Sequence, residues 1–267
     1  MSVAFLTAGG HRLEYQWIRP QPAAEAAPAL VFLHEGLGSV ALWKTFPEQV
    51  ARATGCPALV YSRHGYGKSE RLAAPRTPGY MHLEGQVVLP EVLRQLGIAD
   101  PILIGHSDGA SIALIHAAGG TQPARGLILL APHVFVEELT VRSIAQAKIA
   151  FQTSDLPVRL GRYHDDAQST FLGWNDIWLH PDFRGWNIES CLPAVRAPIL
   201  LIQGEDDQYG TPAQIRAIEK QAAGPVETVV LPRCGHSPHV DQPAATLDAI
   251  SRFVRRRLLP TPATSDE

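Results

Sequence analysis

The sequence predicts an α/β fold built around a mostly parallel central sheet. Short apolar runs, of the kind that form strands buried on both faces, alternate with helix-prone stretches along most of the chain. Strands that alternate with helices form parallel sheets with right-handed crossovers. The chain has 267 residues, of which 45% are hydrophobic and 18% charged. This size and composition suit one globular α/β domain that carries an insertion.

The expected elements follow one another in a regular order. Two early strands are joined by a turn at Gly9 and Gly10, and a loop rich in proline and alanine follows over residues 19–28. Helices are expected at residues 46–53, 80–96 and 110–118, with Pro90 able to kink the second. Strands are expected at residues 3–6, 13–18, 29–33, 58–61, 101–104, 126–130, 198–203 and 227–231.

The most informative motif is Gly-His-Ser-Asp-Gly at residues 105–109. It follows an apolar run and opens a helix-prone run of small residues. A serine between two glycines at a strand-to-helix turn is typical of a nucleophile elbow. The turn is too sharp for side chains at the flanking positions, and it holds the Ser107 hydroxyl clear of the backbone at the positive end of the next helix.

Two further motifs follow predicted strands in the second half of the chain. One is Gly-Glu-Asp-Asp at residues 204–207, and the other is Cys-Gly-His-Ser-Pro-His at residues 234–239. Nucleophile, then acid, then histidine is the chain order of α/β-hydrolases. On these motifs the chain resembles the α/β-hydrolase superfamily, in the branch of small bacterial carboxylesterases, over about residues 30–254.

The resemblance implies a division of the chain into three parts. Residues 1–132 and 191–257 would form the α/β-hydrolase core, and residues 133–190 a helical cap inserted after the sixth strand. The interval 133–190 breaks the strand–helix alternation and holds three of the five tryptophans, whose rings either line a pocket or form a core of the cap itself. Residues 258–267 are expected to be a disordered tail.

The chemistry follows from the weakness of a serine hydroxyl as a nucleophile. It needs a base such as histidine to take its proton, and a buried carboxylate to orient that histidine and stabilise its cation. We assign these roles to Ser107, His236 and Asp207. The resemblance places the acid third after the glycine, which selects Asp207 over its main competitor Asp206. His239 is the competing base. Further alternatives for the acid are the nearby Glu205 and the more distant Asp182.

The resemblance also implies two backbone donors for the oxyanion that develops on the substrate. One is the N–H of Asp108, and the other is that of Gly36, with Leu37 as a substitute. The sequence departs from the family here, since His34 is followed by Glu35 where the family has glycine. Glu35 and Arg63 follow strands expected to be neighbours, so they are either a buried pair that stiffens this loop or two solvated charges.

Substrate contacts are expected from the loops and the cap. The candidate substrate-binding residues are Leu37, His106, Trp174, Trp178 and His239. Three arginines of the cap, Arg159, Arg162 and Arg184, would grip an acidic substrate if they faced the pocket, although arginines of this kind are usually solvated.

Composition excludes several classes of partner. A net charge of -3 argues against nucleic acid, and no apolar run approaches the length of about 20 residues that a membrane span needs. Three scattered cysteines argue against a disulfide scaffold and for a reducing, cytoplasmic location. The histidines lie in different loops without tight metal-ligand spacing, so neither a metal nor another cofactor is expected.

These observations predict a serine hydrolase that cleaves a small carboxylic ester or lactone through an acyl-enzyme on Ser107. A carbon–carbon bond hydrolase, a thioesterase or acyltransferase, and a cofactor-free perhydrolase share the same triad and remain alternatives. A ligand receptor of the same fold is a further alternative from a different class.

Overall fold

The computed structural model describes residues 3–20, 27–119 and 122–259. Within these residues an eight-stranded sheet has the strand order β1-β2-β4-β3-β5-β6-β7-β8. Strands β1 and β2 form an antiparallel hairpin, β2 pairs antiparallel with β4, and the pairs from β4 onward are parallel. The predicted α/β fold with a mostly parallel sheet is therefore confirmed. The strands are β1 Ala4–Ala8, β2 His11–Ile18, β3 Leu30–Leu33, β4 Ala58–Tyr61, β5 Ile102–His106, β6 Gly126–Leu130, β7 Ile199–Gly204 and β8 Val226–Leu231.

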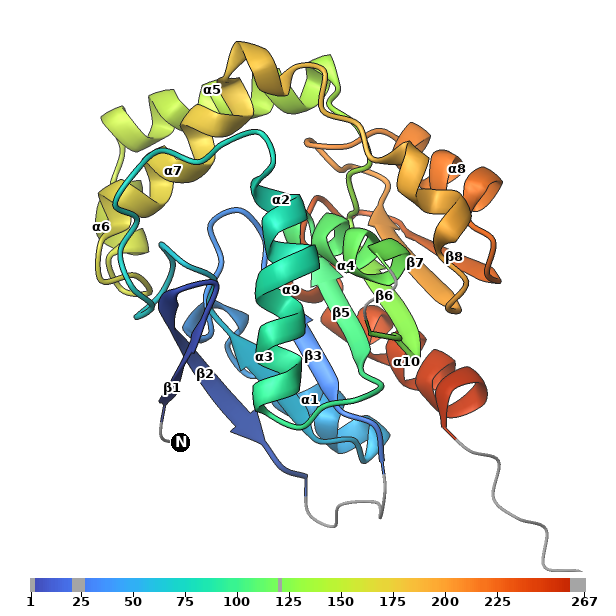
Figure 1. Ribbon diagram of the computed structural model, residues 1–267. Helices are drawn as coiled ribbons and strands as arrows, with labels where there is room; N and C mark the ends of the chain where they lie inside the picture. Colours follow the sequence, from blue (N-terminus) through green and yellow to red (C-terminus); the bar gives the residue numbers. More distant parts are fainter. Residues whose placement is uncertain (1–2, 21–26, 120–121, 260–267) are drawn as a thin grey trace, which may run out of the picture.

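Helices cover both faces of the sheet (Figure 1). The central strands β3 to β7 are buried along their whole length because apolar side chains pack on both sides of them. Two separate apolar clusters result, one on each face. The first face carries α2 Tyr80–Leu83, α3 Leu89–Gln95, α4 Asp108–Gly119 and α8 Pro212–Gln221, and the second carries α1 Phe46–Thr54 and α10 Pro243–Phe253, with the short α9 Pro238–Asp241 before it.

The helix expected over residues 80–96 is interrupted by a wider turn. A π-helical turn, η2 Glu84–Val88, separates α2 from α3. Pro90 falls in the first turn of α3, where a residue without an N–H costs little. The irregularity therefore precedes the proline.

The interval between β6 and β7 is helical and lies over one end of the sheet (Figure 1). It contains α5 Glu138–Thr153, α6 Leu156–Leu160 and α7 Ala167–Leu179, followed by the short helices η3 Pro181–Phe183 and η4 Glu189–Ala194. Phe183 and Trp186 stack on each other and pack against Trp178, so part of the aromatic content forms a local core. Trp174 and Trp178 also line a cavity. Both interpretations of the aromatic residues therefore hold, and Trp178 takes part in the local core as well as in the cavity wall.

The end of the described chain differs from the expectation at one point. Helix α10 continues as the π-helical turn η5 Val254–Leu258, and Leu258 is only 3% exposed because it packs where a side chain on Gly126 would lie. Leu258 thus belongs to the core rather than to the tail. Residues 260–267, for which disorder was expected, lie outside the described residues, as do residues 21–26 of the predicted loop. None of the described helices has the length and apolar character that a membrane span requires.

Candidate active site

Ser107 occupies a sharp turn between β5 and α4. Its φ angle is 52°, a conformation that side chains rarely adopt. A Cβ atom on Gly105 would lie 2.4 Å from the Gly109 carbonyl oxygen, and one on Gly109 would lie 2.0 Å from that of Leu33. Side chains therefore do not fit at either flanking position, as the motif predicted. The strained turn places Ser107 at the carboxyl end of the central strand.

Three side chains that are far apart in the sequence form a hydrogen-bonded chain at this edge of the sheet. His236 Nε2 lies 2.9 Å from Ser107 Oγ, and His236 Nδ1 lies 2.8 Å from Asp207 Oδ1. A carboxylate only accepts hydrogen bonds, so Nδ1 carries the proton and Nε2 is free to accept from the serine hydroxyl. The arrangement has the geometry that general-base activation of a serine requires.

Asp207 is fixed by groups other than the histidine. It follows β7, and its Oδ1 accepts hydrogen bonds from the backbone N–H groups of Tyr209 at 2.8 Å and Gly210 at 3.2 Å. Gln203 donates to Oδ2 at 3.2 Å. Burial alone would raise the pKa of Asp207, but the hydrogen bond and charge of His236 outweigh it and lower the pKa. The carboxylate is therefore ionised at neutral pH.

Asp206 and His239, the competing acid and base, do not enter this chain of hydrogen bonds. The side chain of Asp206 is exposed, and its backbone N–H bonds to the Cys234 carbonyl. The His239 ring packs between Trp43, Phe46 and His106, at centroid distances of 4.9, 5.2 and 5.1 Å. His239 is not among the described residues that line the cavity beside Ser107, because its ring packs against Trp43 and Phe46 of the second apolar cluster.

His106 lies directly behind the reactive groups. It is 1% exposed, and its Nε2 lies 2.7 Å from the backbone carbonyl oxygen of His236. Its Nδ1 faces Glu35 Oε2 at 3.5 Å. Burial lowers the pKa of His106, but the Glu35 carboxylate more than compensates and raises it. One imidazole thus connects the loop after β3, the nucleophile turn and the histidine loop.

Neither of the two alternatives for Glu35 and Arg63 holds, since their side chains do not pair and Arg63 is not solvated. Arg63 is fully buried and donates to the backbone carbonyl of His34 at 2.6 Å and to that of Glu35 at 3.1 Å. Its charged partner is Asp108, at 3.6 Å. The Glu35 carboxylate turns the other way, toward His106. Arg63 still stiffens the loop after β3, but it does so through the backbone.

The predicted oxyanion donors border the same cavity as Ser107, as does the substitute Leu37. Asp108 is the first residue of α4, where N–H groups have no acceptor within the helix. A Cβ atom on Gly36 would lie 2.1 Å from Trp174 Nε1, so this position must be glycine for Trp174 to pack over the loop. The Asp108 carboxylate accepts from Tyr80 at 2.7 Å and from Trp178 at 3.3 Å, which ties the helical insertion to the nucleophile turn.

The cavity beside Ser107 has a volume of about 200 Å³. Four of the five predicted substrate-contacting residues line it, namely Leu37, His106, Trp174 and Trp178. Sequence reasoning did not predict seven further lining residues: Glu35, His133, Thr140, Ile144, Gln208, Tyr209 and Ser237. Four of them lie beside predicted site residues in the sequence, namely Glu35 before Gly36, Gln208 and Tyr209 after Asp207, and Ser237 after His236. Nothing in the sequence marks His133, Thr140 and Ile144. Burial and the neighbouring His236 lower the pKa of His133 to about 3, so its ring is neutral.

One group of metal-ligand residue types lies outside this cavity. His11 and His64 stack at 3.6 Å, and their nitrogens lie within 4.8 Å of a Glu70 oxygen. No motif in the sequence associates His64 with His11, which meet through the pairing of β2 with β4 and the backbone contacts of Glu70. His11 Nδ1 is hydrogen-bonded to Glu70 Oε1, and His64 Nε2 to the Arg71 carbonyl oxygen.

A family model described as the Alpha/beta hydrolase family matches residues 30–249, which is most of the chain. The chain belongs to this family. The resemblance drawn from the nucleophile, acid and histidine motifs is thereby confirmed, and the prediction of a hydrolase is confirmed at the level of the family.

Three relatives whose names give different activities align with this chain over most of their lengths. The sn-1-specific diacylglycerol lipase ABHD11 of Mus musculus is 25% identical, over 94% of this chain and 91% of its own. The 2-succinyl-6-hydroxy-2,4-cyclohexadiene-1-carboxylate synthase of Salmonella schwarzengrund is 22% identical, over 88% of this chain and 96% of its own. An esterase of Mycobacterium tuberculosis is 24% identical, over 84% of this chain and 82% of its own.

Solved structures show the same fold. An alpha/beta hydrolase fold protein from Chitinophaga pinensis superimposes with a TM-score of 0.77 at 15% identity, over 95% of this chain and 97% of its own. The similarity therefore extends through the helical insertion as well as the sheet.

Proposed function

We propose that this protein is a serine hydrolase that cleaves a small carboxylic ester or lactone through an acyl-enzyme on Ser107. The observation that carries the proposal is the hydrogen-bonded chain from Ser107 Oγ through His236 to Asp207. Its open end faces a cavity of about 200 Å³. Two of the relatives are named for ester-cleaving activities, as a lipase and an esterase, which supports the same reaction class.

The proposed reaction has two halves. His236 takes the hydroxyl proton of Ser107 while the oxygen attacks the ester carbonyl, and Asp207 stabilises the resulting imidazolium. The N–H groups of Gly36 and Asp108 receive the oxyanion. His236 then protonates the leaving alcohol, which leaves an acyl group on Ser107. Water activated by the same histidine attacks that acyl group and releases the acid.

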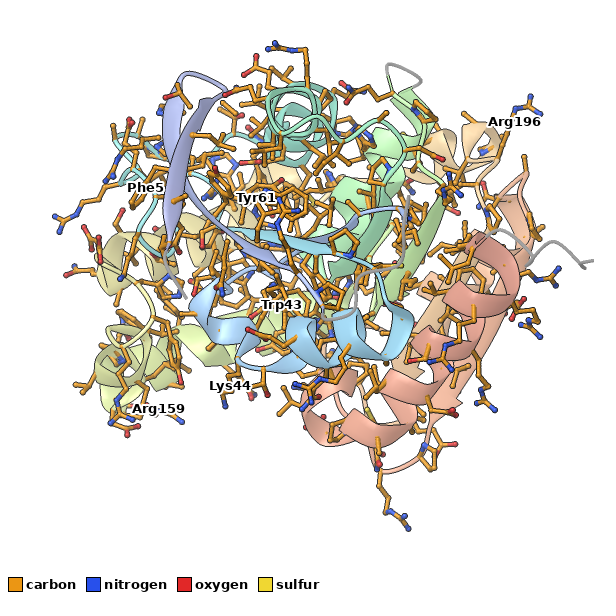
Figure 2. All side chains as sticks on the ribbon, turned by 90° about the horizontal axis from the view of Figure 1, so that it is seen from below. Phe5, Trp43, Lys44, Tyr61, Arg159 and Arg196 are labelled. Carbon is orange, nitrogen blue, oxygen red and sulfur yellow. The ribbon has the colours of Figure 1, made fainter. Side chains whose placement is uncertain are left out.

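The walls of the cavity bear on the alternatives. Neither lysine nor arginine is among the residues that line it. Arg159 pairs with Asp155 and Arg184 with Glu138, both on the exposed surface, and Figure 2 shows Arg159 directed outward. Arg162 is also exposed and, like the other two, is not among the residues that line the cavity, so the three arginines offer no grip for an acidic substrate there. The absence of lysine and arginine from the described cavity wall disfavours the reaction of the 2-succinyl-6-hydroxy-2,4-cyclohexadiene-1-carboxylate synthase, whose name describes a carboxylate.

Labelling with a fluorophosphonate tests the nucleophile without knowledge of the substrate. We expect rapid labelling of the wild type, none of Ser107→Ala, and slow labelling of His236→Ala. Ser111→Ala is a matched control, because Ser111 lies one turn along α4 and donates to the His133 carbonyl. Equal labelling of wild type and Ser107→Ala would refute the proposal. A panel of short p-nitrophenyl esters, thioesters and lactones then separates the reaction classes.

The state of the cysteines indicates the kind of cellular compartment in which the protein works. All three, Cys56, Cys191 and Cys234, are free thiols, and two of them are buried. Unpaired cysteines support our proposal that the protein works in a reducing compartment such as the cytoplasm.

A further inference from the structure

Glu35 stands where the resembling family has glycine, and its side chain reaches the cavity. The Glu35 side chain is 23% exposed, and Glu35 is one of the residues that line the cavity. Its carboxylate lies over Gly38, where a Cβ atom would come within 2.4 Å of Glu35 Oε2. The carboxylate therefore packs directly against the backbone of its own loop at Gly38, a position that only glycine allows.

The charge of Glu35 is retained in this position. Burial would raise the pKa of its carboxyl, but contact with His106 outweighs burial and lowers the pKa. The imidazole of His106, which partly compensates this charge, also lines the cavity, and its other nitrogen lies on the His236 carbonyl. Its side chain is only 2% exposed, against 23% for that of Glu35, so Glu35 is the more accessible member of the pair.

Neither lysine nor arginine is among the described residues that line the cavity, and the one lining imidazole with a raised pKa, that of His106, already faces Glu35. Arg63 is 1% exposed and is occupied by Asp108 and two backbone carbonyls. His133 has a pKa of about 3 and is neutral. Among the lining residues, Leu37, Ile144, Trp174 and Trp178 are apolar. An anionic group that enters this space loses water and meets a like charge.

We propose that Glu35 selects substrates by charge, so that the site takes small uncharged esters and rejects esters that carry a carboxylate. The inference rests on the proposed ester hydrolysis and specifies its substrate class. Unit charges about 7 Å apart at an effective dielectric of about 20 repel enough to change binding roughly 50-fold. Partial compensation by His106 reduces the expected discrimination to about tenfold.

The test compares esters of the same shape that differ only in charge. In the first pair the charge is on the acyl side: mono-p-nitrophenyl glutarate carries a carboxylate, and p-nitrophenyl glutaramate is its neutral amide. In the second pair it is on the alcohol side: acetoxyacetate carries the carboxylate, and acetoxyacetamide is neutral. For at least one pair, we expect the wild-type kcat/KM for the amide to exceed that for the carboxylate about tenfold. In Glu35→Gln this ratio of kcat/KM values, amide over carboxylate, should be about fivefold lower. Asp176→Asn is the control, since it removes the same charge from the outer side of α7, where Asp176 pairs with Lys148.

The possible outcomes separate this inference from the proposed function. A wild-type ratio below twofold for both pairs overturns the charge selection, and this result needs no variant to fold. A ratio unchanged in Glu35→Gln, or lowered equally in Asp176→Asn, also overturns it while ester hydrolysis stands. If the wild type cleaves none of these esters and resists the fluorophosphonate, the proposed function itself is wrong.

Discussion

Removal of the Arg63 side chain should destabilise the fold and impair the site together. The guanidinium is fully buried, donates to two carbonyls of the loop after β3, and lies 3.6 Å from the Asp108 carboxylate. Arg63→Ala leaves that carboxylate buried without its cation, and truncation of one partner of a buried ion pair costs about 3–5 kcal/mol. For a chain of this size each kcal/mol lowers Tm by about 2–4 °C, so we expect a decrease of about 6–20 °C.

The assay is thermal unfolding combined with ester hydrolysis. We also expect kcat/KM to fall at least about tenfold, because the same loop carries the Gly36 donor. The double variant Arg63→Ala/Asp108→Asn should recover about 1–2 kcal/mol, since it removes the unpaired charge. Arg71→Ala is the matched control, because its side chain is 67% exposed and its ion pair with Asp166 is 3.9 Å long. If Arg63→Ala were as stable as Arg71→Ala, the role that we give to Arg63 would be refuted.

Three further predictions concern the triad, the oxyanion loop and the effect of pH. Asp207→Asn should lower kcat by about 10³- to 10⁴-fold with little change in KM, because the wrong histidine tautomer is favoured; a decrease below tenfold would contradict the assignment. Gly36→Ala places a Cβ atom 2.1 Å from Trp174 Nε1, so kcat/KM should fall about 10- to 100-fold, and Trp174→Ala should partly restore it in the double variant if the clash is the cause. His239 has a pKa of about 3 in the fold, against 6.5 when solvated, and its Nδ1 is buried without a partner. Only the unfolded chain therefore takes up this proton between those values, so stability is lost as the pH falls from about 6.5 to 3, by up to about 1.4 kcal/mol per pH unit. Urea unfolding of His239→Phe across this range should show a smaller pH slope than the wild type, and an equal slope would contradict the buried neutral ring.

The positions of the candidate catalytic side chains are strongly constrained by the sequence. Ser107, Asp207 and His236 each follow an apolar run that forms a parallel strand, and the carboxyl ends of parallel strands meet at one edge of a sheet. The glycines at 105 and 109 mark the sharp turn, because only glycine fits there. Local rules about turns and strand ends were therefore sufficient to place these residues near one another.

The partners of the charged loop residues needed the tertiary structure. Glu35 and Arg63 do lie on loops after adjacent strands, as predicted, yet their side chains diverge toward His106 and Asp108. Which way a loop side chain turns depends on cavities and carbonyls supplied by other parts of the chain. No pattern within either loop encodes this choice.

Tertiary packing also decides between the two histidines that follow β8. His236 and His239 are three residues apart and equally plausible as bases by residue type. The start of α9 directs one ring to Ser107 and the other into the core beside Trp43. The sequence alone determined the fold, the family resemblance and the edge at which the site forms, because hydrophobic periodicity and turn chemistry are local. Only the packing of distant segments decided the cavity wall and its charge, because these depend on contacts between residues from β3, β5, α7 and the loops after β7 and β8.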